Sequence, residues 1–354
     1  ANTTCKMSVT ETVPTPQEKN PYQPRINSIR KTIYSEDKRL REKYPILEHQ
    51  NLLGLGWFVG SLMGMGIVSY SYVTGILAWY LAIPLMGLLV SFLHELEHDL
   101  IHDMYFKEKK WMQNLMFGVI WVSKLSANPW WRKPMHLKHH KTSGQLDDIE
   151  ERLIGLGLPL GFKRLLLTLS PLGVYLVIDK VSEDSKKMNS LPGLNVHHTS
   201  LVNLPVLLPA HLALAGIFLP SLLPEMYYNF CWNVCMLLFF PNVIRQACLV
   251  IVSTGVHYFG DIPEKNVFFQ NQVLNHWIFY PLQAFCFNFG ETHILHHYVS
   301  RQPFYLRQMC APGVLEELKQ QGVRFNDLEI YARAHRYYKN LPTDHVKTQL
   351  AVGA

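Results

Sequence analysis

Three clusters of histidine are the residues of this chain best suited to chemistry. They are His94, His98 and His102; His136, His139 and His140; and His293, His296 and His297. A further histidine, His257, follows a long apolar run. Neutral imidazole is a common metal ligand, and residues three or four apart lie on one face of a helix. Each cluster therefore presents its rings to one side of a helix, which predicts metal binding.

The number of histidines exceeds the needs of a single ion. A tetrahedral zinc site takes at most four protein ligands. Eight or nine convergent imidazoles indicate two metals, and a nitrogen-rich site of this kind suits iron. Two other readings stay open. The stretch from His94 through Glu95 to His98 matches the zinc metalloprotease helix, with Glu95 as base, although it gives the other clusters no role. Passive metal binding or transport is the third reading.

The apolar runs predict where the clusters sit. Residues 51–93 are nearly uncharged and too long for one crossing, which needs roughly 20 residues, so we expect helices over 52–71 and 75–96. Two further crossings are expected over 201–223 and 227–256. Residues 153–178 are apolar but contain a central pair of charges, Lys163 and Arg164, which predicts helices lying in the membrane plane. The predicted fold class is all-α, an integral membrane protein whose two helical hairpins carry a cytoplasmic helical cap.

The distribution of charge predicts the orientation and the domain organisation. The expected turns near 71–74 and 219–228 contain no Lys or Arg, so all three clusters and both termini are expected on the cytoplasmic side. We expect a cytoplasmic segment over 1–50, a membrane domain over 51–310 and a cytoplasmic tail over 311–354. The first segment is expected to be loose to about residue 22 and to form a charged surface helix over 33–48. Nucleic-acid binding is not expected, because no aromatic or groove-reading pattern accompanies its basic residues.

Several polar residues beside the clusters are candidates for supporting roles. The acids are candidates to orient imidazoles, or else belong to solvated loops: Glu95, Asp147, Asp148, Glu150, Glu151 and Glu291. Asn242 and Arg245 lie inside the fourth predicted crossing, where an ionisable group is a candidate functional residue. Arg245 precedes His257 by twelve residues, about 18 Å along a helix, which predicts a position well away from the metals. Its partner is expected to be either a substrate carboxylate or a structural acid.

The order of the three histidine boxes, with two helix pairs and an extra histidine after the fourth crossing, resembles the membrane fatty acid desaturase/hydroxylase superfamily. The resemblance covers roughly residues 50–310. It implies iron ligands at His94, His98, His136, His139, His140, His257, His293, His296 and His297. His98 and His102 are the alternative pair for the first box. We favour His94 with His98, because the second predicted helix leads straight into them. The His94–Glu95–x–x–His98 pattern also resembles the first box of alkane hydroxylases.

The resemblance further implies a non-haem di-iron centre with two Fe ions, molecular oxygen as co-substrate, and a fatty acid or fatty acyl substrate drawn from the lipid membrane. Desaturation is the favoured outcome. Hydroxylation of the chain and oxidative decarboxylation of a free fatty acid to a terminal alkene are the alternatives. The sequence contains no His-Pro-Gly-Gly motif and no CxxC pair. Electrons are therefore expected from a separate ferredoxin, rubredoxin or cytochrome b5 type of protein.

Overall fold

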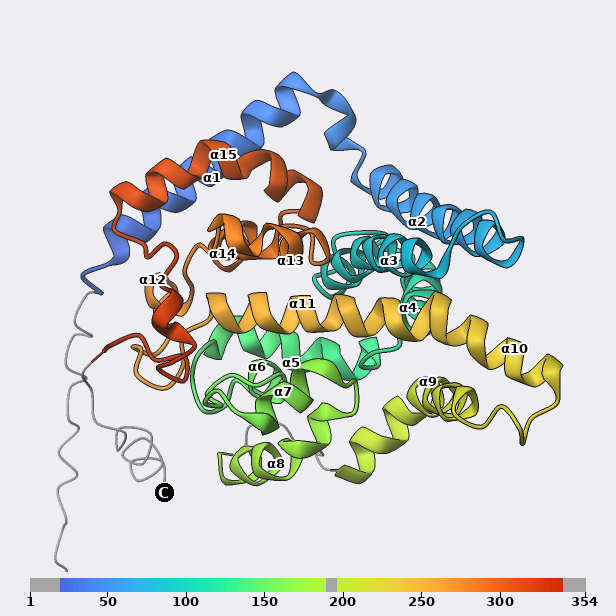
Figure 1. Ribbon diagram of the computed structural model, residues 1–354. Coiled ribbons are helices and arrows are strands. Elements are labelled where there is room, and N and C mark those ends of the chain that lie inside the picture. The colour runs from blue at the N-terminus through green and yellow to red at the C-terminus, as the bar shows by residue number, and fades with distance from the viewer. Residues whose placement is uncertain (1–19, 189–195, 340–354) are drawn as a thin grey trace, which may run out of the picture.

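The computed structural model describes residues 20–188 and 196–339, and this part of the chain is all-helical, with no strand (Figure 1). The α-helices are α1 Gln23–Lys43, α2 Gln50–Val73, α3 Trp79–Ile101, α4 Lys110–Lys124, α5 Pro129–Thr142, α6 Ile149–Leu153, α7 Phe162–Leu169, α8 Ile178–Lys187, α9 Val196–Ile217, α10 Glu225–Val234, α11 Phe240–Val256, α12 Val267–Gln270, α13 Tyr280–Ala284, α14 Phe289–Tyr298 and α15 Phe304–Gln320. Short helical turns are η1 Pro45–Glu48, η2 Gly173–Leu176, η3 Cys235–Phe239, η4 Trp277–Phe279 and η5 Leu328–Ile330.

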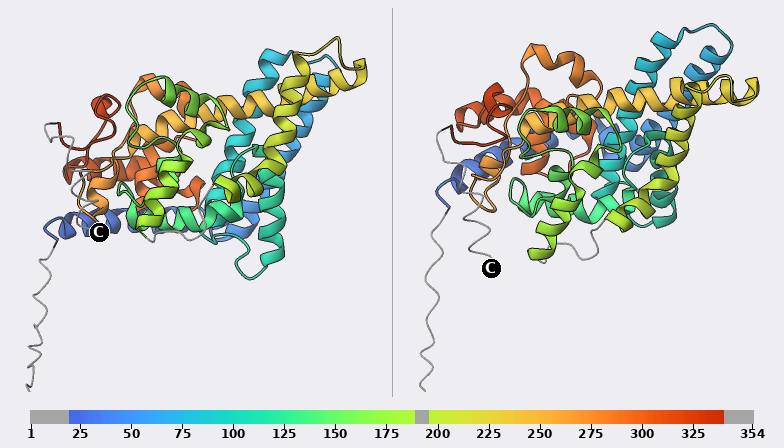
Figure 2. Two further views of the ribbon diagram at one scale, coloured as in Figure 1. Left: turned by 90° about the horizontal axis from the view of Figure 1, so that it is seen from below. Right: turned by 60° about the horizontal axis from the view of Figure 1, so that its bottom comes forward.

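Four helices are long and apolar enough to cross a membrane: Gln50–Val73, Trp79–Ile101, His198–Ile217 and Glu225–Val256. They correspond to the four predicted crossings. The turn that joins α2 to α3 and the turn that joins α9 to α10 lie at the same end of the molecule (Figure 2). One difference affects the site: α3 continues to Ile101 rather than ending near residue 96. The helix therefore carries the first histidine cluster along its last turns.

The fourth crossing is one continuous helical rod made of α10, the η3 turn and α11. The η3 turn is π-helical, a widened turn that often occurs near functional sites. Beyond it α11 packs against α3, α7 and α14 and runs through the centre of the molecule (Figure 1). Because α11 touches the helices on both sides, its inward residues, Asn242 and Arg245, are almost completely buried.

The N-terminal helix is longer than the charged surface helix predicted over 33–48: its charged residues, such as Lys38 and Glu42, are exposed, and its apolar face also contributes to the core. Helix α1 begins ten residues earlier, at Gln23, and buries Ile26, Ile29 and Ile33, which are spaced to share one face. It packs along α15, so segments from opposite ends of the chain lie side by side (Figure 1). The residues expected to be loose before Tyr22 lie mostly outside the described part of the chain.

The stretch predicted to contain in-plane helices forms short helices, α6, α7, η2 and α8, and no membrane-spanning one among the described residues. On α7, Lys163 is exposed while Arg164 is buried. The Arg164 guanidinium hydrogen-bonds to Thr254 and to the His335 ring, which folds the C-terminal part of the chain against α11. Helix α7 packs against α11 through Leu167 and Arg164, but its residues Phe162, Leu165 and Leu169 are exposed, so the in-plane arrangement of this stretch stays a prediction.

Candidate metal centre

The first group of imidazoles gathers five rings from three helices. It contains His98, His102, His136, His140 and His296, whose ligand nitrogens all lie within 4.8 Å of one another. Helix α5 supplies two of the rings. Helix α5 begins at Pro129. The Asn128 side chain caps it by accepting hydrogen bonds from the backbone N–H groups of Trp130 and Trp131. The i, i+4 spacing then directs His136 and His140 to the same side of the helix.

The second group gathers four buried rings: His139, His257, His293 and His297. His257 follows the last residue of α11, and α14 supplies His293 and His297 one turn apart. The Nε2 atom of His293 lies 3.1 Å from that of His257 and 3.0 Å from that of His297. The two groups share helices, since α5 and α14 each contribute to both.

The contacts between nitrogens indicate what these groups bind. The Nε2 atom of His102 lies 3.0 Å from that of His136 and 3.1 Å from those of His140 and His296. A ring nitrogen either donates or accepts a single hydrogen bond, so this mutual arrangement cannot be satisfied by hydrogen bonding among the rings. Bonds of about 2.0–2.1 Å from imidazole nitrogens to one metal ion place neighbouring nitrogens about 3 Å apart. The two groups therefore fit one metal ion each.

The structure changes the pairing favoured for the first box. His94 joins neither group; its Nδ1 atom lies 3.3 Å from the Lys124 ammonium. His102, the alternative, lies in the first group together with His98. The physical reason is the extra length of α3: four residues of helix move the ring by about 6 Å. The grouping therefore favours His98 with His102 over His94 with His98 as the pair of the first box.

Three carboxylates after the second box contact imidazoles. The His136 Nδ1 atom lies 2.6 Å from Glu150, and the His139 Nδ1 atom lies 3.0 Å from both Asp148 oxygens. The Nδ1 atom of His257 donates to the Ser253 backbone carbonyl at 2.8 Å, and Glu151 lies further away, 3.5 Å from the same Nδ1, where it accepts a hydrogen bond from the Ser253 hydroxyl. Acceptors on the far nitrogen hold a ligating imidazole in orientation and increase its basicity.

The other acids named from the sequence have different partners. Asp147 pairs with Lys138 at 3.2 Å, and Glu95 pairs with Arg307 at 3.2 Å. Glu291 lies in the first turn of α14, and in the described part of the chain its carboxylate has no contact with an imidazole. Sequence reasoning missed Gln270, which lies 3.2 Å from His297 Nδ1. No sequence signal marks Gln270, because it comes from α12, far from every box.

Burial sets the protonation of several rings. It lowers the pKa of His102 and of His257 to about 3, so both imidazoles are neutral, the form that binds metal. His139 differs: burial lowers its pKa, but the charge and hydrogen bonds of Asp148 outweigh burial and raise the pKa to about 9. Metal binding at His139 therefore releases a proton.

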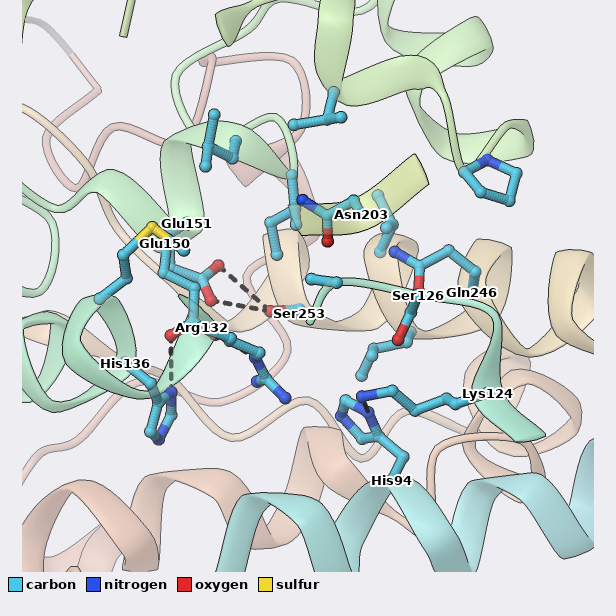
Figure 3. Close-up of a pocket in the computed structure, with 18 of the residues that line it drawn as sticks. His94, Lys124, Ser126, Arg132, His136, Glu150, Glu151, Asn203, Gln246 and Ser253 are labelled. Atoms are coloured by element: carbon cyan, nitrogen blue, oxygen red, sulfur yellow. Dashed lines mark hydrogen bonds and ion pairs between the residues drawn. The ribbon is translucent and has the colours of Figure 1, made fainter. Parts of the chain in front are cut away.

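A cavity of about 170 Å³ adjoins both groups. His98, His136, His139 and His293 contribute to its wall, and so do apolar residues of α6, α7, α9 and α11. Figure 3 shows two polar sides: His136, Arg132, Glu150 and Glu151 on one, and Lys124, His94, Ser126 and Gln246 on the other. Glu97 links the two sides, since it pairs with Lys124 at 2.6 Å and with Arg132 at 2.9 Å.

Arg245 and Asn242 also line this cavity. Arg245 lies on α11, which packs against α3, α7 and α14, and it lines the same cavity as His98 and His293. The expected separation of Arg245 from the metals, about 18 Å along α11 from His257, stays a prediction. Asn242 donates hydrogen bonds to the Ser123 and Leu238 carbonyls, which ties α11 to α4.

Four membrane-length helices that surround two imidazole groups define an integral membrane protein with a metal-binding site. Comparison with known families makes the class specific: the family model named fatty acid desaturase matches residues 74–329, so the chain belongs to the fatty acid desaturase family. The match includes all three histidine boxes and His257. No curated protein matches the chain. Family and structure together make the chain an oxidoreductase of the membrane that modifies fatty acids.

Proposed function

We propose that this protein is an O2-dependent di-iron oxidase that forms a double bond in the hydrocarbon chain of a fatty acid or fatty acyl substrate. The observation that carries the proposal is the pair of imidazole groups, five rings and four, beside one cavity. Iron bound there supplies the oxidising power needed to break an unactivated C–H bond. The rest of the chemistry depends on what this chain positions.

The residues have distinct roles in this proposal. His98, His102, His136, His140 and His296 hold one iron, and His139, His257, His293 and His297 hold the other. Glu150, Asp148, Glu151 and Gln270 hold the rings in orientation. The cavity positions the hydrocarbon chain beside the rings and excludes water, and fixed placement of this kind makes a large contribution to rate. Removal of one hydrogen atom from each of two adjacent carbons, with two electrons and two protons from the donor, reduces O2 to two waters.

Hydroxylation differs only in the fate of the chain after the first hydrogen is removed, so it remains the alternative outcome at the same site. The zinc protease reading has less support, because it requires His94 and His98 on one ion and His94 lies outside both groups. Glu95, the base in that reading, pairs with Arg307. The electron donor is a separate protein of ferredoxin, rubredoxin or cytochrome b5 type, and the boxes face the cytoplasm.

The test combines metal analysis with product analysis. Detergent-purified protein is expected to contain about two iron atoms per chain by elemental analysis. Cells that express it and are fed perdeuterated fatty acids should form products about four mass units lighter per double bond, because two deuterium atoms are lost, or products that carry one added oxygen if hydroxylation occurs. One tightly held zinc with no oxidised lipid would contradict the proposal. Iron binding without oxygen-dependent turnover would instead support a passive metal-binding role.

A further inference from the structure

Arg245 is a buried cation without an acid. Its side chain is 1% exposed, and its guanidinium contacts only neutral amides, Asn242 at 3.5 Å and Gln246 at 3.1 Å. Its Nη1 atom has no hydrogen-bond partner, and no carboxylate forms an ion pair with it, within residues 20–188 and 196–339. An uncompensated charge at this depth is expensive and marks a functional site by default.

The neighbouring cations are paired differently. Arg132 has two carboxylate partners, Glu97 and Glu150, and Lys124 shares the first of them. Both acids therefore form their ion pairs with other cations, although the Oε2 atom of Glu97 has no hydrogen-bond partner and Glu97 attracts Arg245 from beyond ion-pair distance. Glu151, the remaining acid of the cavity wall, lies against Ser253 and His257. Among the described residues, Arg245 has no carboxylate within ion-pair distance.

The same cavity contains further polar atoms without partners. The hydroxyl oxygens of Ser126, Tyr175 and Thr199 are buried and make no hydrogen bond with any described residue, and all three residues line the cavity with Arg245. Buried polar groups are nearly always hydrogen-bonded, so unpaired ones gathered around one space need an explanation. These hydroxyl groups are available as donors to the oxygen atoms of an anion in this cavity.

We propose that Arg245 binds the carboxylate of an unesterified fatty acid, assisted by the hydroxyl groups of this cavity, and thereby selects which carbon of the fatty acid is oxidised. The proposal rests on the di-iron oxidase function above and names its substrate class. A guanidinium matches a carboxylate with two parallel hydrogen bonds, and charge-assisted bonds of this kind are the strong ones. The carbonyl of an ester or thioester lacks the charge that Arg245 requires.

The position of oxidation follows from the shared cavity. Arg245 and the rings of His98, His136 and His293 line one space of about 170 Å³. A fatty acid whose carboxylate lies at Arg245 therefore extends through the same cavity as the imidazole groups, and the separation between Arg245 and the rings selects the carbon that is oxidised. The rest of the fatty acid contacts an apolar part of the cavity wall, which is formed by Leu153, Ile154, Leu167, Val174 and Leu207.

Ligand-dependent thermal unfolding of the iron-loaded protein in detergent tests the head-group site. Saturated free acids of twelve to eighteen carbons are expected to raise the unfolding temperature of the parent protein, and their methyl esters and CoA thioesters are not. Arg245→Met should weaken binding of the free acids by about 10- to 100-fold, as expected for loss of a charge-assisted hydrogen bond. Arg245→Lys should retain part of the affinity. Lys163→Met, which removes a positive charge from an exposed site on α7, is the matched control and should bind as the parent does.

The unfolding temperature without ligand separates binding from a structural role. Because Arg245 forms no ion pair with a carboxylate, Arg245→Met should unfold at the same temperature as the parent or at a higher one. A clear decrease in the unfolding temperature, or failure to fold, would show that Arg245 has a structural role and would overturn the proposal. Equal binding of free acids by the parent and Arg245→Met would also overturn it, as would oxidation at the same carbon by the parent and by Arg245→Met. If free acids bind through Arg245 but no substrate is oxidised, the head-group site stands and the oxidase function fails.

Discussion

The choice between His94 and His102 gives the sharpest test of the metal centre. The Nε2 atom of His102 lies 3.0–3.1 Å from three other ligand nitrogens, whereas His94 contacts Lys124. Replacing a group that only orients a ligand costs about 10- to 100-fold in metal affinity. His102→Ala removes a ligand itself, so we expect a loss of about 100-fold or more, which is about 2.7 kcal/mol.

His94→Ala should leave iron binding unchanged. The imidazole contributes one hydrogen bond to Lys124, worth about 0.5–1.5 kcal/mol, and Lys124 keeps its ion pair with Glu97 at 2.6 Å. The expected cost is therefore a small decrease in stability.

Competition with a ferrous chelator measures both effects on one scale. Each variant is purified with iron and titrated with the chelator, and the retained iron is followed by colorimetry while circular dichroism checks the helical fold. His102→Ala should release iron at a chelator concentration at least about 100-fold lower than the parent, and His94→Ala should follow the parent curve. Loss of iron from His94→Ala with retention in His102→Ala would refute the assignment of the first box.

Two further predictions concern orientation and topology. Glu150→Gln preserves the shape of the side chain but removes the charge that holds His136 and Arg132, so iron affinity should fall by about 10- to 100-fold in the chelator assay. For topology, single cysteines are placed at Thr74 or at Lys141 in a cysteine-depleted background and labelled with an impermeant maleimide. The two positions should be labelled from opposite sides of the membrane. The reason is that one membrane-length helix, α3, separates the α2–α3 turn from the first box.

Each of these experiments has a control in the same chain. Glu183→Gln removes an exposed carboxylate whose partners are lysines, and its iron affinity should equal that of the parent. Equal affinity in Glu150→Gln would show that the carboxylate has no part in holding the ring. Labelling of Thr74 and Lys141 from the same side would contradict the four-crossing arrangement.

The spacing of the histidines and the length of the apolar runs were enough to predict the class of protein. Imidazoles three and four apart share a helix face whatever the surroundings, and about 20 apolar residues span a bilayer by length alone. These local rules predicted an all-helical membrane fold, and the resemblance carried by the order of the three boxes indicated the family to which the chain belongs.

The tertiary structure decided what local rules leave open. His94, His98 and His102 are equally spaced, so the sequence offers two possible pairs for the first box. The positions of α5 and α14 relative to the end of α3 favour the pair of His98 and His102. Gln270 contacts His297 although 27 residues separate them in the sequence, and no periodic pattern predicts contacts between residues so far apart. Arg245 illustrates the same limit, because rise per residue measures distance along α11 but not the distance to a neighbouring helix. Its place in the cavity follows from the way α11 packs against α3, α7 and α14.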